Sequence, residues 1–190
     1  YLIKKGDYIL IKGNSGIGKT TFFNILSGLI KPKKGTISID NSNIHENINA
    51  YWKILGYVPQ NSYLMHGTLA WNITYKKNYT KKDIKLLKVI FEICELNKVT
   101  KNFKTLFENF IVTDAKHISG GQKQRIQIAR ILFKRPEIII FDESFNAIDQ
   151  SSELKILKSI KKYFKNITLV LSSHRPNKIK RLFNKTIVIK

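Results

Sequence analysis

The residues best suited to chemistry begin with GNSGIGKT at positions 13–20, which fits the phosphate-binding pattern G-x-x-x-x-G-K-[ST]. An apolar run at 8–11 precedes this loop as a buried strand would, and residues 21–26 follow it with a helical pattern. Glycines let backbone N–H groups turn inward, and the positive end of the following helix attracts anions. We expect Lys19 to reach the β- and γ-phosphates of a nucleotide and Thr20 to place its hydroxyl on Mg²⁺. The pattern therefore predicts a nucleotide site.

Two carboxylates follow a continuous apolar stretch further along the chain. Residues 138–141 have the pattern of a central parallel strand that is buried on both faces. Asp142 and Glu143 come directly after it, at the strand end where open α/β sheets bind ligands. We expect Asp142 to hold Mg²⁺, directly or through water, and Glu143 to act as the base for a water that attacks the γ-phosphate.

Two further polar positions fall beside predicted elements. Ser119-Gly120-Gly121-Gln122 opens a helix at 123–133, a second anion-binding geometry, although Gly-Gly before a helix often serves only as a turn. The apolar strand at 167–171 ends in Ser-Ser-His, one βα unit after the acidic strand, so we expect His174 in the same site. The other histidines lack metal-ligand spacing or partners and are assigned no chemistry: His45, His66 and His117.

Apolar periodicity predicts an α/β domain in which strands and helices alternate. Between residues 61 and 133 strand signals are scarce, which favours a helical insertion. We expect the helix at 151–164 to begin with serine caps and the last strand to lie at a sheet edge. The predicted strands are 8–11, 36–39, 56–60, 138–141, 167–171 and 186–189, and the predicted helices are 21–26, 51–55, 82–91, 123–133 and 151–164.

Composition narrows the class of protein. A length of 190 residues with 43% hydrophobic content suits one substantial core, and the apolar runs are far too short to cross a bilayer. The net charge of +21 comes from Lys spread along the whole chain, so we interpret it as a compositional bias and expect no specific nucleic-acid face. The single cysteine, Cys94, lies in an apolar helical pattern and is expected to be a buried small residue. The chain begins at Tyr1 without a signal peptide, as if cut from a longer protein.

Taken together, these residues resemble the nucleotide-binding domain of ABC transporters over essentially the whole chain. Residues 13–20 resemble the Walker A loop, 138–142 the Walker B strand and 119–122 the family signature. Gln60 resembles the Q-loop residue and Asp149 the D-loop residue. The resemblance implies a P-loop NTPase fold with a mostly parallel sheet, a small antiparallel part and a helical subdomain inserted between Gln60 and the acidic strand. It implies a core at about 1–60 and 134–190, with the signature subdomain at about 61–133.

The resemblance also implies a role for each site residue, with ATP and Mg²⁺ as the ligands. Catalytic roles fall on Glu143, His174, Gln60 and Lys19, and metal binding on Thr20, Gln60 and Asp142. Nucleotide contacts fall on Asn14, Ser15, Gly16, Ile17, Gly18, Lys19, Thr20 and Thr21 of the loop. The resemblance also implies that a second domain contacts the nucleotide from the opposite side. The residues of that domain that would make these contacts are Ser119, Gly120, Gly121, Gln122 and Asp149.

Finer features resemble the exporter branch of the family. Val58-Pro59-Gln60, the segment 64–73 and His174-Arg175 match its patterns. This implies a transmembrane domain fused upstream, a location on the cytoplasmic face of the cell membrane, and a homodimer or heterodimer of nucleotide-binding domains. The motifs are shared by peptide, lipid and drug exporters, so they do not select a cargo.

Some positions depart from the family, and other classes compete. The signature begins with Ile118 where Leu is commoner, and residues 112–117 lack the usual acidic-glycine pattern. The aromatic residue that stacks on adenine in this family lies well upstream of the phosphate loop, so with twelve residues before Gly13 we expect it outside this chain; Tyr1 and Tyr8 are poor substitutes by position. The main alternative is a non-transport ATPase of the superfamily that acts on DNA or ribosomes. An importer ATPase and a catalytically dead regulatory domain are the others; intact Lys19, Asp142, Glu143 and His174 argue against the last.

Overall fold

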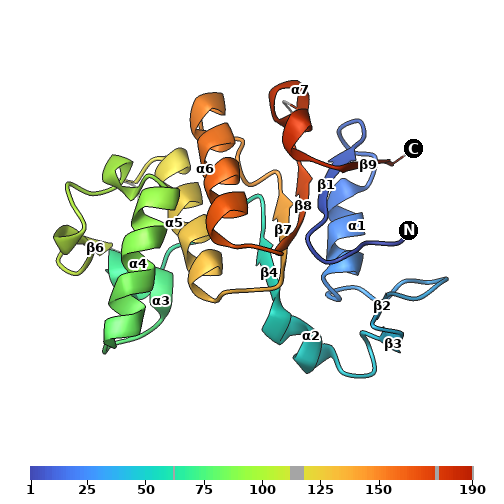
Figure 1. Cartoon of the computed structure of the whole chain (residues 1–190), viewed down its shortest axis with the longest axis horizontal. Coiled ribbons are helices and arrows are strands. Elements are labelled where there is room, and N and C mark those ends of the chain that lie inside the picture. Colours follow the sequence, from blue (N-terminus) through green and yellow to red (C-terminus); the bar gives the residue numbers. More distant parts are fainter. Residues whose placement is uncertain (62, 112–117, 174–175, 190) are drawn as a thin grey trace.

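The central element is a sheet of five parallel strands. The computed structural model describes residues 1–61, 63–111, 118–173 and 176–189 (Figure 1). The strands lie in the order β4-β7-β8-β1-β9, and every neighbouring pair is parallel. Their bounds are β1 Tyr8–Lys12, β4 Leu55–Val58, β7 Ile138–Asp142, β8 Thr168–Ser172 and β9 Lys185–Val188. In this order β8 lies between β1 and β7. Because the three strands are parallel, their carboxyl ends meet at one edge of the sheet.

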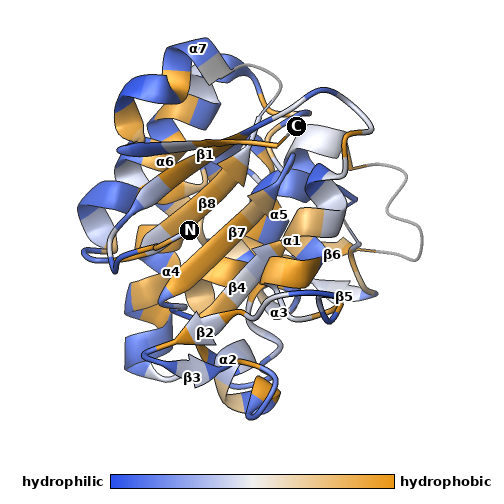
Figure 2. Ribbon diagram, turned by 90° about the vertical axis from the view of Figure 1, so that its right-hand side faces the viewer, coloured by the Kyte–Doolittle hydropathy of each residue, from blue (hydrophilic) through white to orange (hydrophobic). Residues whose placement is uncertain are grey.

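The sheet is apolar on both faces, and Figure 2 shows β1, β7 and β8 as mostly hydrophobic. Successive side chains of a strand point to opposite faces, so its residues divide between two cores. Ile9, Ile140 and Val170 pack in one core, which also contains Phe23 of the first helix. Leu10, Phe141 and Leu171 belong to the other, larger core. A strand buried on both faces reads as a continuous apolar run, as the sequence of β7 does.

Helices cover both faces of this sheet (Figure 1). The smaller core is closed by α1 and α2, and the larger one by α3, α4, α5 and α6. The α-helices are α1 Lys19–Leu26, α2 Ile48–Ile54, α3 Leu69–Thr74, α4 Lys81–Ile93, α5 Gly120–Phe133, α6 Gln150–Tyr163 and α7 Pro176–Ile179. Short 3₁₀ turns are η1 Leu96–Lys98, η2 Lys104–Leu106 and η3 Lys180–Leu182. Two small antiparallel pairs lie outside the sheet: β2 Ser38–Ile39 with β3 Ser42–Asn43, and β5 Gly67–Thr68 with β6 Phe110–Ile111.

The predicted fold class is confirmed: a mostly parallel sheet, helices on both faces and a small antiparallel part. The predicted strand at 36–39 is shorter, since only Ser38 and Ile39 pair with β3. The pairing of β5 with β6 was not predicted, because two-residue strands are too short to show alternation. Cys94 is buried, as expected. No helix in the described part of the chain is both long and apolar enough to cross a bilayer.

The prediction that a serine caps the helix at 151–164 is wrong. The cap is Asp149, whose carboxylate accepts the backbone N–H of Ser152 at 2.9 Å, so the helix begins at Gln150. An ionised carboxylate is a stronger acceptor than a hydroxyl and interacts favourably with the positive end of the helix. The hydroxyl of Ser151 donates to the same carboxylate instead of capping the helix itself.

Candidate functional site

The loop between β1 and α1 presents its backbone to solvent. Gly16 and Gly18 have left-handed backbone angles, with φ of 78° and 100°. A Cβ built on either glycine meets nothing within 4 Å, so both face open space. The helix begins after Gly18 without a side-chain cap, which leaves its first N–H groups for another acceptor. Asn14, Ser15, Ile17 and Thr21 complete the loop and first turn. The segment is therefore shaped as a shallow anion cradle.

Lys19 bends back over this cradle. Its ammonium group donates to the carbonyl oxygens of Gly13 at 3.1 Å and Asn14 at 3.0 Å. The same nitrogen lies 3.7 Å from Oε1 of Glu143, and both side chains are nearly buried. The positive charge of Lys19 is thus balanced by two backbone carbonyls and one carboxylate.

Glu143 is the residue that joins the other predicted groups. Its backbone is left-handed, with φ of 50°, and its N–H donates to the hydroxyl of Ser172 at 3.1 Å. Nε2 of Gln60 donates to Oε2 of Glu143 at 3.1 Å, and Nδ2 of Asn146 donates to the same oxygen at 3.2 Å. The structure therefore brings Lys19, Gln60 and Glu143 together from three separate segments. A left-handed glutamate at the end of a strand is the kind of local strain that occurs at functional sites.

Asp142 lies beneath this group and is buried. Tyr57 donates to its Oδ2 at 3.3 Å, and Ser172 donates to its Oδ1 at 3.4 Å. Burial raises the pKa of Asp142, and a hydrogen bond from Thr20 is the largest effect that opposes this rise. The hydroxyl of Thr20 thus lies close enough to the carboxylate of Asp142 to influence its pKa, and the two groups could serve as oxygen ligands of one cation.

These residues fit a magnesium ion. Mg²⁺ prefers oxygen ligands and is usually held by one or two carboxylates together with substrate phosphates and water. Thr20 and Asp142 provide a hydroxyl and a carboxylate at the edge of the anion cradle. Within the described residues no group of three or more His, Cys, Asp or Glu forms an all-protein metal cage. The chemistry of this donor set therefore suits a metal that arrives with a phosphate.

The signature residues lie at the start of α5 and are held by local contacts. Ser119 and Gln122 cap the helix reciprocally: the N–H of Gln122 donates to Oγ of Ser119, and the N–H of Ser119 donates to Oε1 of Gln122. Nε2 of Gln122 donates to the carbonyl of Lys98 at 2.9 Å. Among the described residues, the signature makes no hydrogen bond or ion pair with the loop at 13–20. Ser119 and Gly120 are exposed instead.

Gly120 and Gly121 pack against Ala147 in the loop that follows Glu143. A Cβ built on Gly121 would lie 2.6 Å from the carbonyl oxygen of Ala147, and one on Gly120 would lie 3.2 Å from its Cβ. The N–H of Ala147 donates to Oε1 of the buried Gln124 at 3.0 Å. The close approach of two backbones within this chain is thus a reason for glycine at both positions.

Asp149 is tied to the same helix. Its carboxylate lies 3.6 Å from Arg125 and 3.7 Å from Lys98. Hydrogen bonds from Ser151 and Ser152 hold the pKa of Asp149 well below its usual range. A buried carboxylate, Glu95, anchors this network. It pairs with Arg125 at 2.8 Å, with Lys155 at 2.9 Å and with Lys98 at 3.3 Å.

Several site residues were not predicted from the sequence. Tyr57, Asn146 and Ser172 contact Asp142 or Glu143, but the sequence analysis assigned none of them a role in the site. Ser172 could have been found, because it is the first polar residue after the strand that was placed beside Asp142. His174, which was predicted in the site, lies outside the described residues. Tyr8 is buried under Phe183 and Lys161, so its ring is not available to stack on a base.

Comparisons with known proteins agree with this geometry. Residues 1–146 match the family model described as ABC transporter. The mitochondrial ATP-dependent permease MDL2 of Saccharomyces cerevisiae is 37% identical over 187 residues, covering 97% of this chain and 24% of the permease. The ATP-dependent lipid A-core flippase of Wigglesworthia glossinidia brevipalpis is 36% identical over 182 residues, covering 94% of this chain and 31% of the flippase.

A solved structure has the same fold. A bacterial Atm1-family ABC exporter with ATP bound superposes with a TM-score of 0.87 at 27% sequence identity. The match covers 98% of this chain and 32% of the exporter. The chain therefore spans about a quarter to a third of the length of the relatives it matches.

Proposed function

This chain belongs to the ABC transporter family, and we propose that it binds ATP with Mg²⁺ and hydrolyses the ATP to drive an exporter. The observation that carries this proposal is the contact of Glu143 with both Lys19 and Gln60 at the mouth of an open anion cradle. Members of this family are generally ATPases. The named relatives are a permease and a flippase, which favours export over the alternative of an ATPase that acts on DNA or ribosomes.

The loop at 13–20 binds the phosphates of ATP in this proposal. Its free N–H groups donate to phosphate oxygens, and Lys19 exchanges the carbonyls of Gly13 and Asn14 for the β- and γ-phosphates. Thr20 and Asp142 hold Mg²⁺, with Gln60 as a further ligand. The metal, when bound, neutralises charge on the phosphate oxygens. Asp142 is kept in place for this role by Tyr57 and Ser172.

Glu143 then serves as the general base. Its carboxylate is held by Gln60 and Asn146 on one oxygen and approached by Lys19 on the other. When Lys19 moves to the phosphates, Oε1 of Glu143 loses the Lys19 cation and becomes a better acceptor of a proton from water. Gln60 and His174 position that water, so the chemistry is phosphoryl transfer to water.

The site is completed by a second nucleotide-binding domain. Ser119 and Gly120 are exposed and make no hydrogen bond to their own phosphate loop within the described residues, so they are available to a partner. We infer that Ser119, Gly120, Gly121 and Gln122 of that partner, with its Asp149, close over ATP from the other side. Binding of ATP thus joins two domains, and hydrolysis releases them.

The proposed transporter includes a transmembrane domain fused upstream and acts at the cytoplasmic face of the cell membrane. We assign residues 1–60 and 134–190 to the ATP-binding core and 61–133 to the subdomain that carries the signature. Tyr63, Met65 and Phe110 are exposed apolar side chains beyond Gln60, and His66 packs edge-on against Phe110. This cluster offers a docking surface for the membrane domain, and a change at Gln60 is well placed to move it.

Replacement of Glu143 by Gln tests the proposal. The change keeps shape and hydrogen bonding but removes the base, so ATP hydrolysis should fall by a factor on the order of 10²–10⁴ while ATP binding remains. Sedimentation with and without Mg-ATP should show a longer-lived dimer of the variant. Glu137→Gln is the matched control at the other end of the same strand, where the carboxylate only pairs with exposed Lys5. Near-normal hydrolysis in Glu143→Gln, in the full-length protein, would refute the role of Glu143.

A further inference from the structure

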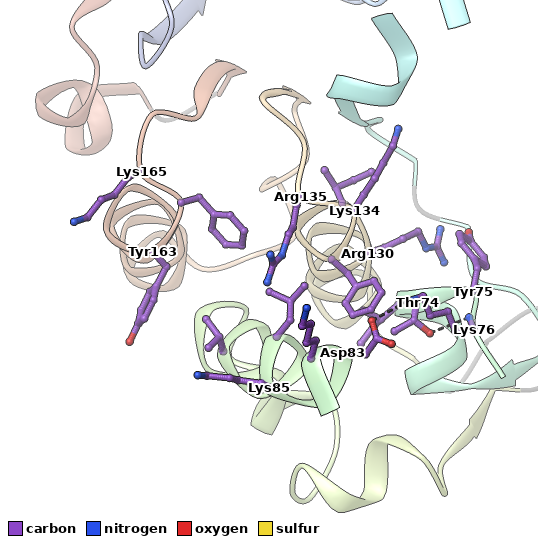
Figure 3. A pocket seen from close by; sticks show the side chains of 17 residues that line it. Thr74, Tyr75, Lys76, Asp83, Lys85, Arg130, Lys134, Arg135, Tyr163 and Lys165 are labelled. Atoms are coloured by element: carbon purple, nitrogen blue, oxygen red, sulfur yellow. Dashed lines mark hydrogen bonds and ion pairs between the residues drawn. The ribbon is translucent and has the colours of Figure 1, made fainter. Parts of the chain in front are cut away.

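A groove lies at the end of α5 that is farthest from the signature. Its walls are the ends of α3, α5 and α6 and the first half of α4, and its volume is about 1020 Å³ (Figure 3). Since α5 runs 14 residues from Gly120 to Phe133, the groove is about 20 Å from Ser119. It shares no residue with the loop at 13–20 or with the carboxylates of the proposed ATP site.

The groove is more basic than the chain as a whole. Seven of its 17 lining residues are Lys or Arg, whereas the whole chain has 34 in 190. The fraction of basic residues is therefore more than twice the average of the whole chain, and these cations gather around one groove. The only acidic residue of the lining is Asp83, and it is already paired with Lys76 at 2.8 Å.

Three of the seven basic side chains make hydrogen bonds or ion pairs within the chain. Lys76 pairs with Asp83, and Lys134 donates to the backbone carbonyls of Trp52 and Leu55. Nε of Arg130 donates to the carbonyl of Asn72 at 2.7 Å. The side chains of the other four are exposed and make no hydrogen bond or ion pair with any part of the chain that the structure describes: Lys82, Lys85, Arg135 and Lys165.

Arg135 is the most informative of these four. Its φ is 52°, a left-handed conformation that an arginine adopts at a cost of about 1–2 kcal/mol relative to an ordinary backbone, and which Gly or Asn adopts more readily. Figure 3 shows its guanidinium reaching from the end of α5 toward α4, on the side where α6 ends. Within the described residues no protein group accepts from this guanidinium, and because the side chain is exposed it is available to a ligand in the groove.

The floor of the groove is apolar. Leu86 and Val89 of α4 and Phe133 of α5 line it together with Phe164, which follows α6. Neither a nucleic-acid backbone nor a small inorganic anion has apolar surface to bury against these side chains. The volume is at the upper end of the roughly 300–1,000 Å³ that small-molecule sites occupy. We propose that this groove binds an amphipathic organic anion: a phosphate or carboxylate held by Lys82, Lys85 and Arg135, with a hydrocarbon body on Leu86, Val89 and Phe133.

Binding of dodecyl phosphate below its micelle concentration tests the proposal by calorimetry, without ATP. Dodecyl phosphate should bind at least tenfold more tightly than inorganic phosphate, which lacks the body, or dodecyltrimethylammonium, which has the opposite charge. Lys85→Glu combined with Arg135→Asn should weaken binding about tenfold or more, because hydrogen bonds to charged groups are strong. Asn suits the left-handed backbone at 135 better than Arg does, so loss of binding in that variant is not loss of fold.

Lys158→Glu is the control for charge alone. Lys158 is an exposed lysine of α6 outside the groove, and its replacement should change affinity less than twofold. Equal loss in the control and the groove variant would overturn the proposal, since general charge would then explain the binding. Equal affinity for dodecyl phosphate and dodecyltrimethylammonium would also overturn the proposal. Binding to phosphatidylglycerol vesicles without binding to monomeric dodecyl phosphate would assign these cations to a membrane surface instead.

Discussion

Lys19 Nζ lies 3.7 Å from Oε1 of Glu143, so the cation proposed to bind phosphate is paired with the proposed base. The two opposite charges partly neutralise each other. In the proposed mechanism a γ-phosphate competes for Lys19, and separation of the pair makes Glu143 a stronger base. The relationship links occupancy of the cradle to the availability of the base.

Lys19→Ala should weaken ATP binding. It removes the main positive charge on the β- and γ-phosphates, and a charged hydrogen bond contributes about 1.5–3 kcal/mol, which is about ten- to hundredfold in affinity. Fluorescence titration with a nucleotide analogue measures it, with Lys31→Ala as the control at an exposed lysine. Because Tyr8 is buried, the chain itself should bind ATP modestly. Submicromolar affinity would show that another residue of the chain stacks on the base.

Tyr57→Phe should raise the Mg²⁺ concentration needed for half-maximal ATP hydrolysis. The change deletes the hydroxyl that holds Asp142 and leaves the ring in place. Because this hydrogen bond is long, at 3.3 Å, we expect it to contribute about 0.5–1.5 kcal/mol, the range of an ordinary hydrogen bond, so the expected increase is about two- to tenfold. Tyr51→Phe is the matched control, since its hydroxyl donates to the carbonyl of Leu26 in the same core. A similar Mg²⁺ shift in both variants would count against the positioning of Asp142 by Tyr57.

Gly121→Ala should destabilise the chain although alanine is the better helix former. Helix propensity favours Ala over Gly by about 1 kcal/mol. The added Cβ, however, lies 2.6 Å from the carbonyl of Ala147, and overpacking of this kind costs about 1–3 kcal/mol. Denaturant unfolding should therefore show a net loss for Gly121→Ala and a smaller one for Gly120→Ala, where the nearest contact is 3.2 Å. A gain in stability for Gly121→Ala would mean that the loop containing Ala147 moves at little cost to make room for the added Cβ.

Glu95→Gln should lower stability in a pH-dependent way. Burial raises the pKa of Glu95, but hydrogen bonds from Ser152, Lys155, Arg125 and Lys98 more than offset this and bring it to about 2, from an ordinary value of 4.5. A carboxylate whose pKa is lower in the folded state contributes stability above pH 4.5 and loses it as the pH falls toward 2. The variant should be about 2 kcal/mol less stable at pH 7.

The difference between wild type and Glu95→Gln should shrink between about pH 5 and pH 2. Urea unfolding at a series of pH values measures it, since the difference between the two proteins cancels the titration of other groups. Glu92→Gln, at an exposed position near the end of α4 and three residues before Glu95, is the control and should change little. A difference that stays constant with pH would mean that Glu95 contributes by packing and not by charge.

The sequence predicted the parts of the site that depend on neighbours along the chain. The loop at 13–20 is a local structure: its glycines, Lys19 and Thr20 are contiguous, and the flanking strand and helix follow from periodicity. The buried strand before Asp142 reads directly as an apolar run. Short-range geometry of this kind is fixed by backbone sterics and hydrogen bonding within a few residues, so the residue types suffice to predict it.

Only the tertiary structure decided which distant side chains meet. The order β4-β7-β8-β1-β9 places Gln60, Glu143 and Lys19 at one edge, and no local pattern encodes which strand lies between which. The role of Tyr57 depends on the parallel register of β4 with β7, and that of Ser172 on the register of β8 with β7. The packing of Gly121 on Ala147 likewise depends on where two loops approach. Such contacts arise from burial of the whole core, which is non-directional and acts over the entire chain, so a linear pattern carries little trace of them.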